Sequence, residues 1–160
     1  MDVTIMPSTT SILTNLKNKY PQFIFKSNNN FYWSYLDNTI YYDENSPHMS
    51  IFLLHELSHA LLGHNQYDYD IQLITMERQS WEHTILLAPS FDINIPDDLI
   101  QNTLDSYREW IHSRSTCPKC NATGLQIASN TYKCLACNDK WRVNEAKNCA
   151  LRRYEIKKCT

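Results

Sequence analysis

The six cysteines of the chain are all confined to its C-terminal part, since none lies in the first 116 residues. Four of them form two Cys-x-x-Cys pairs separated by thirteen residues: Cys117, Cys120, Cys134 and Cys137. Four thiolates at this spacing are typical of a tetrahedral structural zinc site. A segment this short has no core of its own, so metal binding would supply much of its folding energy. The cysteines therefore predict a small zinc ribbon.

Two nearby disulfides are the alternative interpretation of the same cysteines. Disulfides occur mainly in secreted proteins, and the N-terminal segment MDVTIMPSTT has neither the basic nor the long apolar region of a secretory signal. No apolar run approaches the roughly 20 residues that a membrane span needs. We therefore expect zinc rather than disulfides, a cytoplasmic location, no membrane association, and free thiols at Cys149 and Cys159.

The charge of the chain changes sign near Ser113. Residues 1–113 hold five Lys and Arg against fourteen Asp and Glu, a net charge of −9. Residues 114–160 hold ten against three, a net charge of +7. At 160 residues, one medium domain with a small appendage is the natural division. The sequence thus predicts two domains, 1–113 and 114–160, and a partner of acidic character for the second.

Periodicity and breaker residues predict an α+β first domain. Apolar, β-branched and aromatic runs predict helices at 8–19, 47–63, 71–88 and 96–113, and strands at 23–25, 31–36 and 39–42. We expect the strands to form a small antiparallel sheet. Ser46 and Pro47 suit the start of the second helix, and Gly63 suits its end.

Residues 55–59 of that second helix read His-Glu-Leu-Ser-His. Positions i and i+4 of a helix lie on one face, so His55 and His59 can offer imidazole nitrogens to one metal ion. Glu56 is placed to act as a general base for a water molecule there. The helix is apolar nearly all round, which predicts that it is buried. Because buried polar side chains need partners, a zinc ion is the simplest partner for all three.

A catalytic zinc site takes a third protein ligand besides these two histidines. His64 lies five residues after His59, about 140° away from the ligand face if the helix continues. Glu77 on the next helix is favoured, because the other residues of its face are apolar: Ile74, Trp81, Ile85 and Ala88. Glu82 is the rival on a more polar face of the same helix, and His83 is a further candidate.

Three runs of the chain resemble a known family: HELSHALLGH at 55–64, ERQSW at 77–81 and LLAP at 86–89. They are similar to the ImmA/IrrE-type metallo-endopeptidases, which typically show HELxHxxLGH, then ExxAN on the following helix, then a hydrophobic stretch ending in proline. The resemblance covers roughly residues 36–90. Trp81 departs from the pattern, since Asn or Asp usually stands there and supports a metal-bound histidine. The support of that histidine must therefore be built differently here.

The resemblance implies a zincin-like minimal metallopeptidase domain of the gluzincin kind, in which the third zinc ligand is a glutamate. It makes His55, His59 and Glu77 the ligands of a catalytic zinc and Glu56 the general base. The expected function is a zinc-dependent metallo-endopeptidase that hydrolyses peptide bonds of a protein substrate. One catalytic and one structural zinc are expected.

Two other functions fit the same features. A SprT-like protease acting on DNA-bound proteins also couples HExxH to a C-terminal zinc ribbon, but it normally takes a third histidine. A non-catalytic zinc-ribbon adaptor would use the HELSH site for structure alone. In residues 114–160, basic side chains alternate with the aromatic residues Tyr132, Trp141 and Tyr154. This pattern suits DNA or other nucleic acid, and the alternatives are another acidic partner or the acidic first domain.

Overall fold

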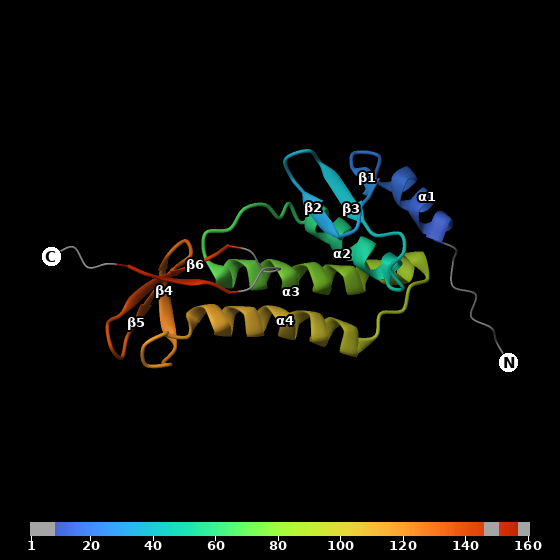
Figure 1. The fold of residues 1–160 in the computed structure, drawn as a ribbon. Helices are drawn as coiled ribbons and strands as arrows, with labels where there is room; N and C mark the ends of the chain where they lie inside the picture. Colours follow the sequence, from blue (N-terminus) through green and yellow to red (C-terminus); the bar gives the residue numbers. More distant parts are fainter. Residues whose placement is uncertain (1–8, 146–150, 157–160) are drawn as a thin grey trace. The chain divides into compact units, whose positions relative to one another are not determined.

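A computed structural model describes residues 9–145 and 151–156 of the chain. The described residues have an α+β fold with four α-helices and two small sheets (Figure 1). None of these helices combines the length and the apolar character needed to cross a membrane.

The chain forms two compact units, each assembled from two stretches of sequence. The first unit holds the residues up to 65 and 76–100, and the second holds 66–75 and the residues from 101 onward. Helices α3 (Asp70–Leu87) and α4 (Asp97–Ser115) each contribute residues to both units. The predicted domains 1–113 and 114–160 stay a prediction.

The first unit contains one helix before its sheet and the candidate metal-binding motif after it. Its elements are α1 (Thr9–Lys19), β1 (Ile24–Ser27), β2 (Tyr32–Ser34), β3 (Thr39–Tyr42), α2 (Met49–Leu61), the later part of α3 and the short 3₁₀ helix η1 (Ala88–Phe91). Apolar side chains of α1, α2 and the sheet form one core, which includes Leu16, Ile40 and Leu54.

The sheet of the first unit has the strand order β1-β3-β2 and is mixed. The prediction of an antiparallel sheet is wrong for β1, which pairs parallel with β3, and holds for the pair β2 and β3. In β3 neighbouring residues such as Thr39 and Ile40 are both buried, so both faces of this strand are covered. β1 buries only Phe25, and β2 buries none of its residues. The strand covered on both faces takes the centre, which leaves the other two at the edges.

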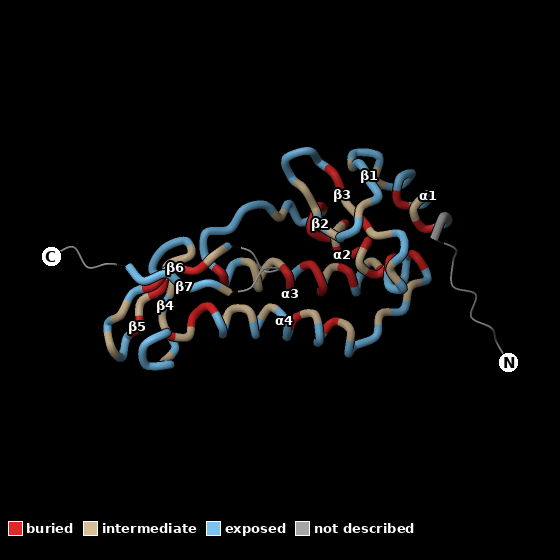
Figure 2. The backbone as a smooth tube through the Cα atoms, viewed as in Figure 1, coloured by how far each residue is buried: buried red, intermediate tan, exposed pale blue. Residues whose placement is uncertain are grey.

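Helix α2 is buried along most of its length, as its apolar sequence predicts (Figure 2). It begins at Met49, two residues later than expected, because Ser46 caps the preceding turn: its Oγ accepts a hydrogen bond from the N–H of His48. The helix ends as expected before Gly63, whose φ of +68° is in the left-handed region. The N–H of His64 then donates to the carbonyl of His59 at 3.0 Å, which turns the chain back over the last helical turn.

The second unit is built around a four-stranded antiparallel sheet. Its strands, in the spatial order β4-β5-β6-β7, are β4 (Gly124–Ala128), β5 (Thr131–Cys134), β6 (Lys140–Val143) and β7 (Arg153–Glu155). Tyr132 and Trp141 lie opposite each other on β5 and β6 and stack with ring centroids 5.7 Å apart. Together with Cys117, Cys134 and Val143 they form the core of this unit.

A buried ion pair joins this sheet to two helices of the same unit. Arg114, near the end of α4, is 1% exposed, and Asp70, the first residue of α3, is 2% exposed. The guanidinium donates to both carboxylate oxygens, with Nε–Oδ2 at 2.7 Å and Nη2–Oδ1 at 3.3 Å. Arg114 also donates to Asn130, and the hydroxyl of Tyr132 donates to Asp70. The sequence-based interpretation missed this pair, because nothing in the sequence connects two charged residues that are 44 positions apart.

Gly124 is needed where β4 approaches Trp141. A Cβ at this position would overlap the Trp141 ring and lie 3.1 Å from the carbonyl oxygen of Lys133. We expect Gly124→Ala to destabilise the second unit by about 1–3 kcal/mol through overpacking. Chemical denaturation followed by tryptophan fluorescence measures the effect, with the exposed neighbour Thr123→Ala as the control. Equal stability of the two variants would contradict this account of the packing.

Candidate functional site

His55, His59 and Glu77 converge in the first unit, two from α2 and one from α3. The Nε2 atoms of the two histidines are 3.1 Å apart. Glu77 Oε2 lies 3.1 Å from His55 Nε2, and Oε1 lies 3.5 Å from His59 Nε2. Donor atoms arranged tetrahedrally around one zinc ion would be roughly 3.3 Å apart, given zinc–ligand distances of about 2.0–2.1 Å. All three side chains are buried, and the group fits a metal ion of this size.

The two rival third ligands lie elsewhere. Glu82 is exposed, and its carboxylate accepts a hydrogen bond from Arg78 at 2.6 Å. His83 contacts Ser58 Oγ through Nδ1 at 3.2 Å. Of the three candidates, the structure brings only Glu77 to His55 and His59. The ligand roles of these residues stay a prediction.

Ser80 and Trp81 hold the imidazole of His55. The Ser80 hydroxyl donates to the His55 carbonyl at 2.7 Å, and its oxygen lies 3.3 Å from His55 Nδ1. Because the hydroxyl proton is engaged, Ser80 accepts from an Nδ1–H, so Nε2 is the ring nitrogen that faces Glu77 and that would bind a metal ion. Trp81, the position that departs from the family pattern, stacks on the His55 ring at a centroid distance of 4.2 Å. A serine and an indole face thus provide the support that the family pattern assigns to Asn or Asp.

His64 and Gln79 hold the imidazole of His59 in the same way. His64 Nε2 lies 3.3 Å from Gln79 Oε1, so it is the proton donor of that bond. His64 Nδ1 then accepts from His59 Nδ1 at 2.8 Å, so His59 Nε2 is the ring nitrogen that faces the other two donor atoms. Burial, followed by the nearby His59, lowers the pKa of His64, consistent with a neutral acceptor ring. Sequence reasoning missed His64 and Ser80 as orienting residues.

The charges of this group support a metal ligand set with one anion. Burial opposes ionisation of Glu77, but hydrogen bonds from His55 and His59 hold its pKa well below the usual range. Burial also acts to lower the pKa of His59, and the hydrogen bond to Glu77 outweighs it, so that this pKa is raised. Glu77 is therefore a carboxylate, which is the form that binds cations.

Glu56 lies beside this group without being part of it. Burial raises the pKa of its carboxyl group, against the attraction of His55 and His59 and a hydrogen bond from the backbone of Trp33. Trp33 belongs to β2, the edge strand, so the carboxyl group of Glu56 lies next to an open edge of the sheet.

A cavity of about 450 Å³ opens between the end of α2 and α3. Its walls are apolar and polar side chains of the turn after α2 and of α3: Leu62, His64, Gln79, Glu82, His83 and Leu86. His64 contacts Nδ1 of His59, the ring atom that points away from Glu77. His55, His59 and Glu77 are not among the residues that line this cavity.

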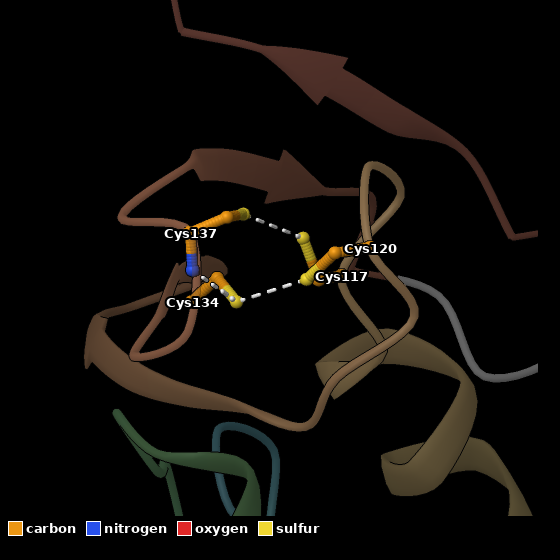
Figure 3. Close-up of side chains that lie close together, drawn as sticks. All are labelled: Cys117, Cys120, Cys134 and Cys137. Carbon is orange, nitrogen blue, oxygen red and sulfur yellow. Dashed lines mark hydrogen bonds between the residues drawn. The ribbon is translucent and has the colours of Figure 1, made fainter.

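The four cysteines of the second unit form a compact cluster (Figure 3). Cys117 Sγ and Cys137 Sγ are 3.7 Å apart, and Cys120 Sγ and Cys134 Sγ are 3.5 Å apart. A disulfide needs about 2.05 Å, whereas sulfurs around one zinc ion are roughly 3.8 Å apart. The described cysteines are free, and their geometry fits a tetrahedral metal ion.

The backbone of the cluster favours thiolates. The N–H of Lys119 points to Cys117 Sγ and that of Cys137 points to Cys134 Sγ, each at 3.4 Å. The bond from Cys137 is the main reason why the pKa of Cys134 is lowered to about 7. Thiolates are the form that binds zinc. The predicted free thiols Cys149 and Cys159 lie outside the described residues.

No protein-family model matches the chain, and neither a curated protein nor a solved structure matches it significantly. The resemblance to ImmA/IrrE-type enzymes therefore stays a prediction that rests on residues 55–64, 77–81 and 86–89.

Proposed function

We propose that the protein is a zinc-dependent metallo-endopeptidase. In this proposal His55, His59 and Glu77 bind the catalytic zinc, and Glu56 is the general base. The observation that carries it is the arrangement of the three donor atoms, with both imidazoles held by hydrogen bonds so that their Nε2 atoms face one carboxylate. When bound, zinc would polarise the scissile carbonyl and lower the pKa of a water molecule towards about 7.

The residues of the chain would supply proton transfer and substrate alignment. Glu56 takes the proton of the attacking water and delivers it to the leaving amine. Its neighbour β2 is an edge strand, and an extended peptide that adds to this edge would pass beside the Glu56 carboxylate. This geometry favours substrates cleaved in unfolded or extended segments.

The four-cysteine cluster would hold the second, structural zinc. Its four protein ligands leave no open position for a substrate, which distinguishes it from the three-ligand group. We therefore expect two zinc ions per chain with different roles.

Metal content tests the ligand set. Glu77→Ala is expected to lower the zinc content from two ions per chain to one, because it removes the anionic donor. Glu82→Ala, on the same helix but exposed, is the matched control and should retain both. Loss of one zinc by His83→Ala but not by Glu77→Ala would instead support the SprT-like alternative.

Proteome-wide mapping of new N-termini tests the activity. We expect the zinc-loaded protein to produce new termini and Glu77→Ala to produce none, while Glu82→Ala behaves as wild type. A wild-type protein that binds two zinc ions and yields no new termini would support the non-catalytic adaptor and contradict the peptidase.

A further inference from the structure

The strand register of the second unit divides its charged and apolar side chains between two faces of the sheet. Directly opposed residues of antiparallel strands point to the same side. One row across the sheet is Leu125, Lys133 and Lys140, and the next is Thr131, Arg142 and Tyr154. The alternating residues Tyr132 and Trp141 point to the other side and are buried. These two rows define what we call the outer face of the sheet.

The outer face is cationic and has no acidic side chain in either row. Lys140 and Arg142 are exposed, and Lys133 is half-buried. Within the described part of the chain, none of the three forms an ion pair. Arg114 by contrast is neutralised by Asp70 and is buried, so it offers no charge to a partner.

The face also exposes an aromatic and an aliphatic side chain. Tyr154 is 44% exposed and Leu125 56%. Tyr154 lies opposite Arg142, so a planar ring and a guanidinium are neighbours on adjacent strands. Apolar surface among cations does not match the phosphate exterior of a duplex, whereas the bases of a single strand can stack on it while its phosphates bind the cations.

We propose that the outer face of β4–β7 binds single-stranded nucleic acid. Phosphates contact Lys133, Lys140 and Arg142, and a base stacks on Tyr154. The whole segment 114–160 carries +7, and even a zinc ion with four thiolates, which together carry about −2, would leave it positive. The charge of the segment is thus complementary to a polyanion. This site is independent of the proposed peptidase activity.

The test uses the full-length, zinc-loaded protein and fluorescence anisotropy with 15-nucleotide oligo-dT, oligo-U and a duplex of equal length. We expect both single strands to bind more tightly than the duplex. Replacing all three cations by glutamine should weaken binding by about tenfold to a hundredfold near physiological salt and reduce the slope of log K against log salt by about 2. The substituted residues are Lys133, Lys140 and Arg142.

The matched control removes the same charge from the first unit by replacing Lys17, Lys19 and Lys26 with glutamine, and should bind as wild type. Tyr154→Leu should weaken binding by about fivefold to a hundredfold, whereas Tyr154→Phe should retain it. Zinc content and circular dichroism establish that each variant is folded. Equal losses in the two triple variants, tighter binding of the duplex, or tighter binding of oligoglutamate than of either single strand would each overturn the proposal.

Discussion

Replacing Glu56 by glutamine is expected to reduce peptide hydrolysis by about 10²- to 10⁴-fold, because a neutral amide cannot accept the proton of the attacking water. The substitution preserves the size of the side chain, and Glu56 does not belong to the three-residue ligand group. Zinc content and thermal stability should therefore remain close to wild type. The measurement is kcat/KM on a peptide taken from the mapped cleavage sites, together with zinc per chain.

The exposed Glu82→Gln provides the control, since it makes the same chemical change on the helix that carries Glu77. It should leave kcat/KM within about twofold, as expected for a surface substitution away from the reacting atoms. Two results would count against the assigned role of Glu56. One is activity retained within a few-fold in Glu56→Gln, and the other is loss of the catalytic zinc from that variant.

Arg114→Met is expected to destabilise the second unit by about 3–5 kcal/mol, because it leaves the Asp70 carboxylate buried without its cation. Asp70 is 2% exposed, so water cannot replace the two lost hydrogen bonds. The loss of stability should appear as reduced hydrogen-exchange protection of β5 and β6. These strands carry Tyr132, which donates to Asp70, and Trp141, which donates to the carbonyl of Arg114.

Arg108→Met on the same helix is the matched control. Arg108 is ion-paired with Asp105, but the two side chains are 56% and 58% exposed. Exposed pairs contribute about 0–1 kcal/mol, so this variant should unfold at nearly the wild-type denaturant concentration. Similar losses in the two arginine variants would show that the buried pair does not stabilise the unit.

Local spacing predicted the parts of the two candidate metal groups that lie close together in sequence. His55 and His59 are one helical turn apart, and each Cys-x-x-Cys pair places its sulfurs together through its own backbone. Glu77 could be chosen from helical periodicity, because it is a lone charged residue on an otherwise apolar face. The prediction of which α3 residues are buried was only partly correct. Ile85, which was assigned to the buried face, is 49% exposed, and the polar residues Ser80 and Thr84 are buried.

Features that depend on distant pairing or on a change of chain direction could not be predicted. Asp70 and Arg114 are 44 residues apart, and single charges in a sequence are more often found on surfaces. The parallel pairing of β1 with β3 depends on which strand is covered on both faces, a tertiary property. His64 was placed off the ligand face by assuming a continuous helix, whereas Gly63 ends the helix and returns His64 to His59.

The turn at Gly63 makes the candidate metal-binding motif ten residues long rather than five. Transferring HELSH alone to another helix would supply the imidazoles of His55 and His59. It would omit His64, which accepts the hydrogen bond from Nδ1 of His59. A design or a search that retains residues 55–64 includes both proposed histidine ligands and the turn that orients one of them. The glycine, which touches no ligand atom, is then as much part of the motif as the histidines.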